Sequence, residues 1–153
     1  RPLAVLAGSG NSADAHHLST PDPTGAGARR AIRLALGSLA ATVVGYVNAH
    51  ATGTLLNDQM EAAALALELP GAAISGSKGA LGHTLGAAGA LEAAITVRAL
   101  MEGRLPPNVG LLRPGFDLDL VRRTRETHID AAMSVNFAFG GHNAALLFTT
   151  PGS

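Results

Sequence analysis

The sequence of 153 residues contains no cysteine and no tryptophan, and only 14% of its residues are charged. Without cysteine, the chain has no disulfide, no thiolate metal site and no thiol nucleophile. Its formal net charge of zero gives no electrostatic reason to bind nucleic acid or an anionic membrane. No apolar run reaches the ~18 residues without charges that a membrane span needs. The beginning at Arg1 does not resemble a signal peptide, so we expect a cytoplasmic protein.

The low charge is matched by an excess of apolar residues. Hydrophobic residues make up 47% of the chain, and its mean hydropathy is +0.26. A chain of this length holds one domain with its own core, which we place at residues 1–153. The remaining apolar surface predicts a large obligate interface with another protein. The chain also begins without methionine, which favours a processed protein or a piece of a longer one.

Short apolar runs alternate with helical patterns along the chain, and this alternation predicts an α/β fold. Strands are expected at residues 3–7, 43–48, 72–75, 131–135 and 144–149, with the last two adjacent and antiparallel. A polar loop is expected at residues 8–24. Helices are expected at residues 25–39, from about 57 to 69, and at 85–100.

The helix expected at residues 85–100 contains only two charged residues, Glu92 and Arg98. A helix that is apolar on nearly all sides belongs in the middle of a packed protein. Lys78 and His83 stand just before it, among glycines. A lysine and a histidine at the mouth of a buried helix are costly unless they are paired or used in chemistry.

Polar or glycine-rich loops follow three of the predicted strands. The segments are VNAHATGT at residues 47–54, SKGALGHTLGAAGALE at 77–92 and NFAFGGHN at 136–143. In open α/β sheets, ligand sites form where loops from several strand ends meet. A lone buried histidine such as His50 would more often be a core residue with satisfied nitrogens. Together with His83 and Lys78 in a matching loop, it predicts a functional site.

The order, spacing and flanking strands of these segments resemble the β-ketoacyl synthases, the condensing enzymes of fatty acid and polyketide synthesis. The likeness runs from about Gly8 to Phe148 and covers only the C-terminal half of that family's domain. The resemblance implies one βαβαβ half of a thiolase-like fold, with the 85–100 helix as its central buried helix. The family's nucleophilic cysteine lies in the other half, which would be on a partner chain.

The resemblance also implies roles for individual residues. His50 and His83 would donate N–H groups to the thioester oxygen on which enolate charge develops when a malonyl thioester loses carbon dioxide. Lys78 would fix the orientation or tautomer of His83. Glu61 would neutralise Lys78, because a buried ammonium needs a partner. The backbone N–H of Phe139 would form half of the oxyanion hole, and its ring would gate the acyl pocket.

Substrate contacts are implied in two loops. Thr52 and Thr54 would contact the phosphopantetheine of an acyl carrier protein. Phe137, Gly140 and Gly141 would belong to the substrate-binding loop, in which the glycines let the backbone approach the site. We expect no metal and no cofactor bound by this chain, since the substrate travels on the carrier's own arm. The expected partners are the cysteine-bearing half, the carrier protein and a second copy of the completed synthase.

Three residues depart from the family's pattern. Ala51 and Ala138 stand where the family has glycine, and His142 stands where it has threonine. If either alanine needs a positive φ, it carries a strain of order 1 kcal/mol or more.

Two further clusters contain residue types that bind ligands. The pair His16 and His17 lacks a third ligand at helical spacing and is better explained as part of a loop than as a metal site. The cluster of Arg29, Arg30 and Arg33 fits a solvated helix face and a basic patch for an acidic carrier protein equally well.

The leading hypothesis is a split acyltransferase, in which this half is active only with its partner chain. One alternative is a non-catalytic subunit that resembles a chain length factor and shapes the acyl pocket. The other is half of a thiolase-like decarboxylase. A natural split and a shortened full-length enzyme would give the same sequence, and the sequence does not identify chain length or product.

Overall fold

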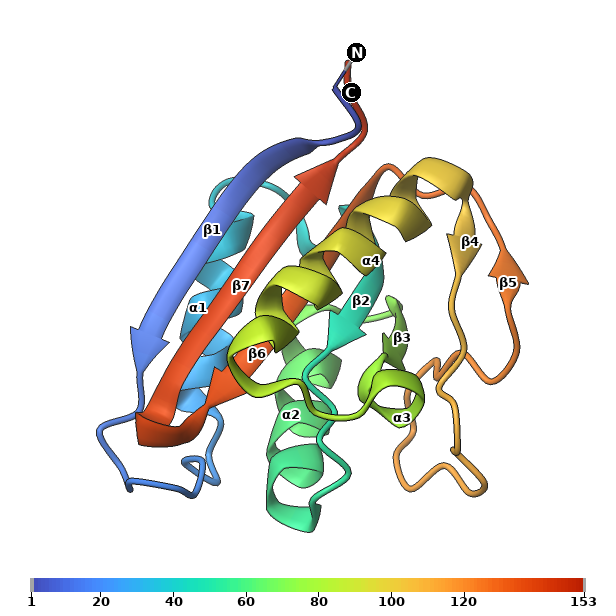
Figure 1. Cartoon of the computed structure of the whole chain (residues 1–153). Helices are drawn as coiled ribbons and strands as arrows, with labels where there is room; N and C mark the ends of the chain where they lie inside the picture. Colours follow the sequence, from blue (N-terminus) through green and yellow to red (C-terminus); the bar gives the residue numbers. More distant parts are fainter. Residues whose placement is uncertain (1, 153) are drawn as a thin grey trace.

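A computed structural model describes residues 2–152 of the chain. Its main sheet contains β1 (Val5–Ala13), β2 (Val44–Ala49), β3 (Ala73–Gly76), β6 (Ala131–Ala138) and β7 (His142–Thr149). Figure 1 shows these five strands in the order β1-β7-β6-β2-β3. β2 runs parallel to β3 and β6, whereas β7 runs antiparallel to β6 and β1. The predicted antiparallel pair at the end of the chain is therefore confirmed.

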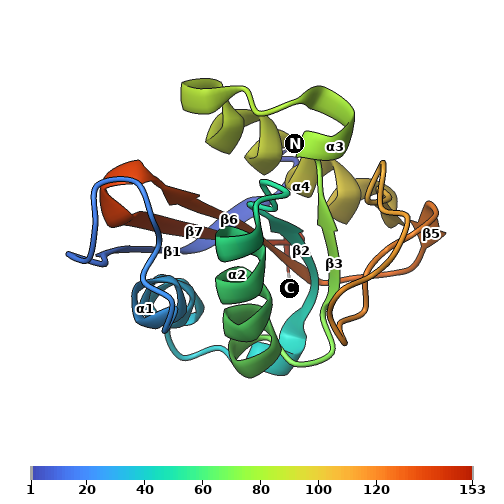
Figure 2. The same cartoon turned by 90° about the horizontal axis from the view of Figure 1, so that it is seen from below.

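Helices lie on both faces of this sheet. α1 (Ala26–Leu36) and α2 (Leu55–Glu68) cover one face, while the short α3 (Lys78–Leu81) and α4 (Ala88–Glu102) lie on the other, as Figure 2 shows. A small second sheet pairs β4 (Arg104–Leu105) with β5 (Arg125–Glu126) beside α4. Within residues 2–152, no helix is both long enough and apolar enough to cross a membrane.

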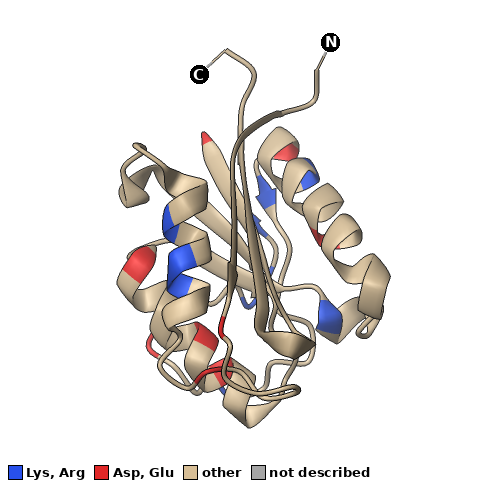
Figure 3. Ribbon diagram, turned by 90° about the vertical axis from the view of Figure 1, so that its left-hand side faces the viewer, with Lys and Arg blue, Asp and Glu red and all other residues tan. Residues whose placement is uncertain are grey.

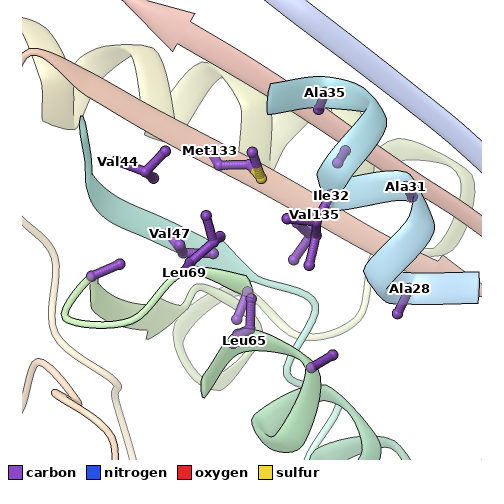
Figure 4. Close-up of a cluster of buried hydrophobic side chains, with 14 of the residues drawn as sticks. Ala28, Ala31, Ile32, Ala35, Val44, Val47, Leu65, Leu69, Met133 and Val135 are labelled. Carbon is purple, nitrogen blue, oxygen red and sulfur yellow. The ribbon is translucent and has the colours of Figure 1, made fainter. Parts of the chain in front are cut away.

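The larger core lies between the sheet and the pair α1 and α2. Its side chains come from apolar runs whose strands are buried on both faces, as expected for parallel strands between helices. Figure 4 shows this cluster, which includes Ala28, Ala31, Ile32, Ala35, Val44, Val47, Leu65, Leu69, Met133 and Val135. A second cluster packs α4 on the opposite face around Tyr46, Ala99, Leu100 and Ala132.

Strand β1 is longer than predicted. It runs to Ala13 because its polar second half pairs in register with β7, for example Asn11 with Ala144. Helix α1 approaches this strand very closely. A Cβ on Gly10 would lie 2.0 Å from the carbonyl oxygen of Ala31, so only glycine fits there. The short, polar residues of this segment suit a strand under a close helix, whereas the sequence pattern had indicated a loop.

Helix α4 begins at Ala88, three residues later than predicted. Leu85 has a φ of +52°, in the left-handed region, and this conformation separates the preceding turn from the helix. α4 packs across β6 beside β2 and β7, and β1 is left uncovered on that side (Figure 1).

The end of α3, the turn before α4, the outer face of α4 and the β1 edge of the sheet form an apolar surface that is uncovered in this chain. Leu81, Leu85 and Leu91 are 53%, 73% and 42% exposed, and Val5 on β1 is 43% exposed. Figure 3, which faces the β1 edge, shows almost no charged residue on β1 and β7. This arrangement agrees with the excess of apolar surface inferred from composition.

Candidate active site

The loops that follow β2, β3 and β6 meet at one edge of the sheet, because these strands are parallel neighbours. They enclose a pocket of about 470 Å³. Six of the residues predicted from sequence line this pocket, namely His50, Thr52, Thr54, His83, Phe137 and Phe139. Lys78 and Glu61 are buried behind it. Gly140 and Gly141 lie in the turn between β6 and β7.

The two histidines lie side by side in the pocket. Their ring centroids are 5.6 Å apart, and the ring planes are nearly perpendicular, at 87°. His50 is buried and His83 is exposed. Phe137 lies edge-on to His50 with a centroid distance of 6.1 Å. The two imidazoles can therefore act on one small group bound between them.

The tautomer of His50 is set by Lys78. The Lys78 Nζ lies 3.2 Å from the His50 Nδ1 and 2.5 Å from the Glu92 Oε1. An ammonium only donates, so His50 Nδ1 accepts, and the ring hydrogen of neutral His50 lies on Nε2. Burial first, and then the charge of Lys78, lower the pKa of His50 from 6.5 to about 4. His50 is therefore neutral near pH 7.

The tautomer of His83 is set by the backbone. Its Nδ1 accepts the N–H of Leu85 at 3.1 Å. In the neutral ring the hydrogen therefore lies on Nε2, as in His50. The left-handed conformation of Leu85 belongs to this turn and is a local strain at the site. The expected role of Lys78 in orienting His83 is therefore wrong, because Lys78 contacts His50 instead.

The predicted ion pair between Glu61 and Lys78 is also wrong. Lys78 pairs with Glu92, and the two side chains are 5% and 2% exposed. The reason is topological: Glu61 stands on α2, on the opposite face of the sheet from α3 and α4. Ser77 Oγ also donates to Glu92 Oε1 at 3.3 Å. Glu92 could have been found from sequence, since it is one of two charged residues in an otherwise apolar helix.

Glu61 holds the turn that carries His50. Its Oε1 accepts the backbone N–H of His50 at 2.7 Å, and its Oε2 accepts the backbone N–H of Ala51 at 2.8 Å. Asn57 Nδ2 donates to the same Oε2 at 3.0 Å. Burial raises the pKa of Glu61 from 4.5 to about 7, although these three donors oppose the shift.

The two alanines that depart from the family's pattern behave differently. Ala51 has a φ of +41°, so this alanine carries the strain expected for a positive φ. Ala138 has a φ of −104° and a ψ of 163°, an extended conformation that any residue adopts.

The turn after β6 is tied to the loop after β1. Phe139 is 77% exposed at the pocket, and Gly140 and Gly141 have φ values of +79° and +71°. The N–H of Asp14 donates to the carbonyl of Gly141 at 2.9 Å. Asn143 Nδ2 donates to Asp14 Oδ1 at 2.7 Å. Neither residue was predicted as part of the site, although Asp14 lies inside the polar loop expected at residues 8–24 and Asn143 ends the segment at 136–143.

The other predicted contacts have clear structural settings. Thr52 and Thr54 line the pocket, with their hydroxyl oxygens 2.8 Å apart. Arg29 and Arg33 both bind Glu68 on α2, each at 2.7 Å, which favours a structural role over a free basic patch.

Comparison with known proteins gives one consistent picture. The family model described as beta-ketoacyl synthase, C-terminal domain, matches residues 3–112. The chain is 40% identical over 152 residues to a 3-oxoacyl-[acyl-carrier-protein] synthase 2 from Synechocystis, covering 94% of this chain and 36% of that protein. The corresponding protein of Mycobacterium leprae is 41% identical over 153 residues, with coverages of 95% and 36%.

Solved structures agree with these matches. A beta-ketoacyl synthase from Burkholderia phymatum superposes with a TM-score of 0.89 and 38% identity, over 97% of this chain and 38% of that one. A ketosynthase in complex with its chain length factor, from Xenorhabdus doucetiae, gives a TM-score of 0.89 and 38% identity, with coverages of 98% and 40%. The chain therefore spans a little over a third of the relatives it matches, and the predicted α/β fold class is confirmed.

Proposed function

Because the chain belongs to the β-ketoacyl synthase family and carries its C-terminal domain, we propose that it supplies the histidine and lysine part of a condensing site. The cysteine nucleophile would lie on an N-terminal half. The assembled enzyme would extend an acyl thioester with malonyl units carried by an acyl carrier protein, in fatty acid or polyketide synthesis. No metal and no cofactor of this chain takes part in the proposed reaction.

One observation carries this proposal. In both histidines the Nδ1 atom is occupied, by Lys78 at 3.2 Å and by the Leu85 N–H at 3.1 Å. Each neutral ring therefore carries its N–H on Nε2, and both rings line one pocket, in which the Asn136 side chain also hydrogen-bonds His50. Two fixed donors aimed at one carbonyl oxygen are what stabilisation of an enolate needs.

The proposed step is a decarboxylation followed by a carbon–carbon bond formation. The bond between the malonyl α-carbon and its carboxylate breaks, carbon dioxide leaves, and the electron pair forms an enolate on the thioester. His50 and His83 donate to the enolate oxygen. The α-carbon then attacks the acyl group held as a thioester on the cysteine, and the cysteine thiolate leaves. Both imidazoles stay neutral, consistent with the lowered pKa of His50.

The remaining site residues fit binding and acyl transfer. Thr52 and Thr54 would hydrogen-bond the phosphopantetheine arm along the pocket. Phe139 would supply a backbone N–H to the oxyanion of the acyl transfer step, and its exposed ring would gate the acyl chain. Gly140 and Gly141 hold the left-handed turn that this loop needs.

The uncovered apolar surface supports completion by a second half. Leu85 is exposed at the pocket, and Leu91 is exposed on the outer face of α4. The relatives that match this chain are more than twice its length. We propose that the N-terminal half covers this surface and brings its cysteine to the histidines, and that two completed copies form a dimer.

The test is co-expression of this chain with an N-terminal ketosynthase half, followed by native mass measurement and separate assays of decarboxylation, acyl transfer and condensation. His50→Ala and His83→Ala should each lower decarboxylation by about 100-fold or more while the complex stays intact. His128→Ala is the matched control, because its side chain is 83% exposed and lies outside the pocket.

Two outcomes would overturn the proposal. Condensation that survives both histidine replacements would favour a non-catalytic subunit like a chain length factor. Decarboxylation without any acyl transfer would favour a thiolase-like decarboxylase.

A further inference from the structure

The most unusual feature behind the pocket is a buried carboxylate that binds only N–H groups. Glu61 is 3% exposed, and its oxygens accept hydrogen bonds from His50 N, Ala51 N and Asn57 Nδ2. Among residues 2–152, no cation forms an ion pair with it. A buried carboxylate without a cation is costly, so these three donors are what stabilises its charged form.

Two of the donors are consecutive backbone N–H groups, and such pairs form anion-binding concavities when one residue is left-handed. Here the left-handed residue is Ala51, which is not glycine and is therefore strained by about 1 kcal/mol. The carboxylate that binds both N–H groups holds this strained turn closed. His50, whose imidazole faces the pocket, is one of the two residues held.

We propose that Glu61 positions His50 through the backbone of the turn between β2 and α2, and that only the ionised carboxylate does so. The proposal rests on the function proposed above and assigns to Glu61 a role without substrate contact. Protonation removes the negative charge that attracts the three N–H groups, and the oxygen that takes the proton becomes a weaker acceptor. The hydrogen bonds to His50 N and Ala51 N are then weaker, and the turn at Ala51 is held less firmly.

The charged and titratable surroundings of Glu61 are few. Asp58, one turn earlier on α2, opposes ionisation of Glu61. His50 and Lys78 face the turn from the pocket side. The loop opposite α2 shares a cavity of about 120 Å³ with Glu61 and presents only Asn108 and apolar side chains there. The arginines of α1 bind Glu68, at the other end of α2.

Ionisation of Glu61 should therefore set the acidic limit of activity. Burial raises its pKa to about 7, whereas His50 has a lowered pKa of about 4 and stays neutral across that range. The decarboxylation rate of the assembled synthase should fall on the acidic side with a midpoint near pH 7. In Glu61→Gln the rate at high pH should be lower, because an amide N–H₂ faces a backbone N–H, and this acidic limb should disappear.

Asn57→Ala gives a second, milder test. It removes one donor from the carboxylate, which disfavours the charged form. The acidic limb should move to higher pH with the rate at high pH largely kept. Glu68→Gln is the matched control, because it removes another buried carboxylate of α2 that touches no part of the pocket. It should leave the pH profile unchanged.

Hydrogen exchange of the amides in residues 48–53 measures how stably the turn is closed, independently of activity. After correction for intrinsic rates, the wild-type amides should lose protection as the pH falls through about 7. Glu61→Gln should show low protection at every pH, and Glu68→Gln should match the wild type. An acidic limb that is unchanged in both Glu61→Gln and Asn57→Ala, or protection that is independent of Glu61, would overturn the proposal. A complex that decarboxylates at no pH would overturn the proposed function, while the exchange experiment would still decide the role of Glu61.

Discussion

Glu61 accepts the backbone N–H of His50 at 2.7 Å, yet burial shifts the pKa values of these two residues in opposite directions. Burial raises the pKa of Glu61 from 4.5 to about 7 and lowers that of His50 from 6.5 to about 4. In both cases burial favours the neutral form. The catalytic arrangement that we propose needs the neutral histidine and the charged glutamate. Burial therefore favours the required form of His50 and disfavours the required form of Glu61.

This relationship predicts two opposing effects of pH on stability. Between pH 4.5 and about 7, folded Glu61 keeps a proton that the unfolded chain has released, so its contribution to stability falls as the pH rises. Between about 4 and 6.5, unfolded His50 binds a proton that the folded protein does not, so its contribution rises with pH. Each effect amounts to about 3 kcal/mol and they cancel where they overlap.

The measurement is the free energy of unfolding from chemical denaturation at several pH values. In Glu61→Gln, the contribution of His50 should be unmasked, and stability should rise more steeply toward pH 6.5 than in the wild type. In His50→Ala, the contribution of Glu61 should be unmasked, and the free energy of unfolding should fall relative to the wild type as the pH rises toward 6.5. Equal pH slopes in the wild type and Glu61→Gln would contradict the raised pKa of Glu61.

A second prediction concerns Lys78 and Glu92. Their side chains are almost fully buried and 2.5 Å apart, so Glu92→Ala leaves an ammonium buried without its carboxylate. We expect a loss of about 3–5 kcal/mol in the free energy of unfolding. The double change Lys78→Met with Glu92→Leu should lose much less, because no charge is left buried.

The control for this pair lies on the same helix. Glu102→Ala removes the exposed partner of Arg98 and should cost about 1 kcal/mol or less. If Glu92→Ala cost no more than Glu102→Ala, the buried pair would contribute nothing, and the orientation of His50 would need another explanation.

The sequence predicts that the three loops meet, but not that Lys78 pairs with Glu92. The three loops could be predicted to meet, because apolar strands of this kind are parallel and their ends lie at one edge of the sheet. The partner of Lys78 could not be predicted in this way, because it depends on which face of the sheet each helix occupies. Glu61 and Glu92 lie on helices of opposite faces, and helical spacing alone does not distinguish these faces.

Two further features depend on backbone conformation, which residue types alone do not reveal. The polar segment after Gly8 reads as a loop until its pairing with β7 is known. The backbone N–H of Leu85 that fixes His83 leaves no signal in residue type, because every residue except proline carries one.

A third prediction uses the two alanines at positions where the resembled family has glycine. Ala51→Gly should raise the free energy of unfolding by up to about 1 kcal/mol, because it relieves the left-handed strain at φ +41°. Ala138→Gly should lower it by about 0.5–1 kcal/mol, because Ala138 is extended and glycine only adds entropy to the unfolded chain. The same sign for both changes would contradict the conformations described here.

A fourth prediction concerns the close contact between β1 and α1. A Cβ on Gly10 would lie 2.0 Å from the carbonyl oxygen of Ala31, and the nearest atoms are backbone atoms that cannot rotate away. Gly10→Ala should therefore cost about 3 kcal/mol or more, by pushing the helix off the strand. Gly115→Ala is the control, since nothing lies within 4 Å of its added Cβ.

The consequence of Gly10→Ala should extend beyond stability. The loop that begins with Asp14 leads along the chain into α1. Asp14 in turn hydrogen-bonds Gly141 and Asn143 in the turn beside the pocket. Displacement of α1 from β1 should therefore loosen the turn that carries Phe139. Hydrogen exchange of residues 138–143 should increase in Gly10→Ala and stay unchanged in Gly115→Ala. A destabilised Gly10→Ala protein with full protection of this turn would mean that the β1 edge and the pocket are held independently.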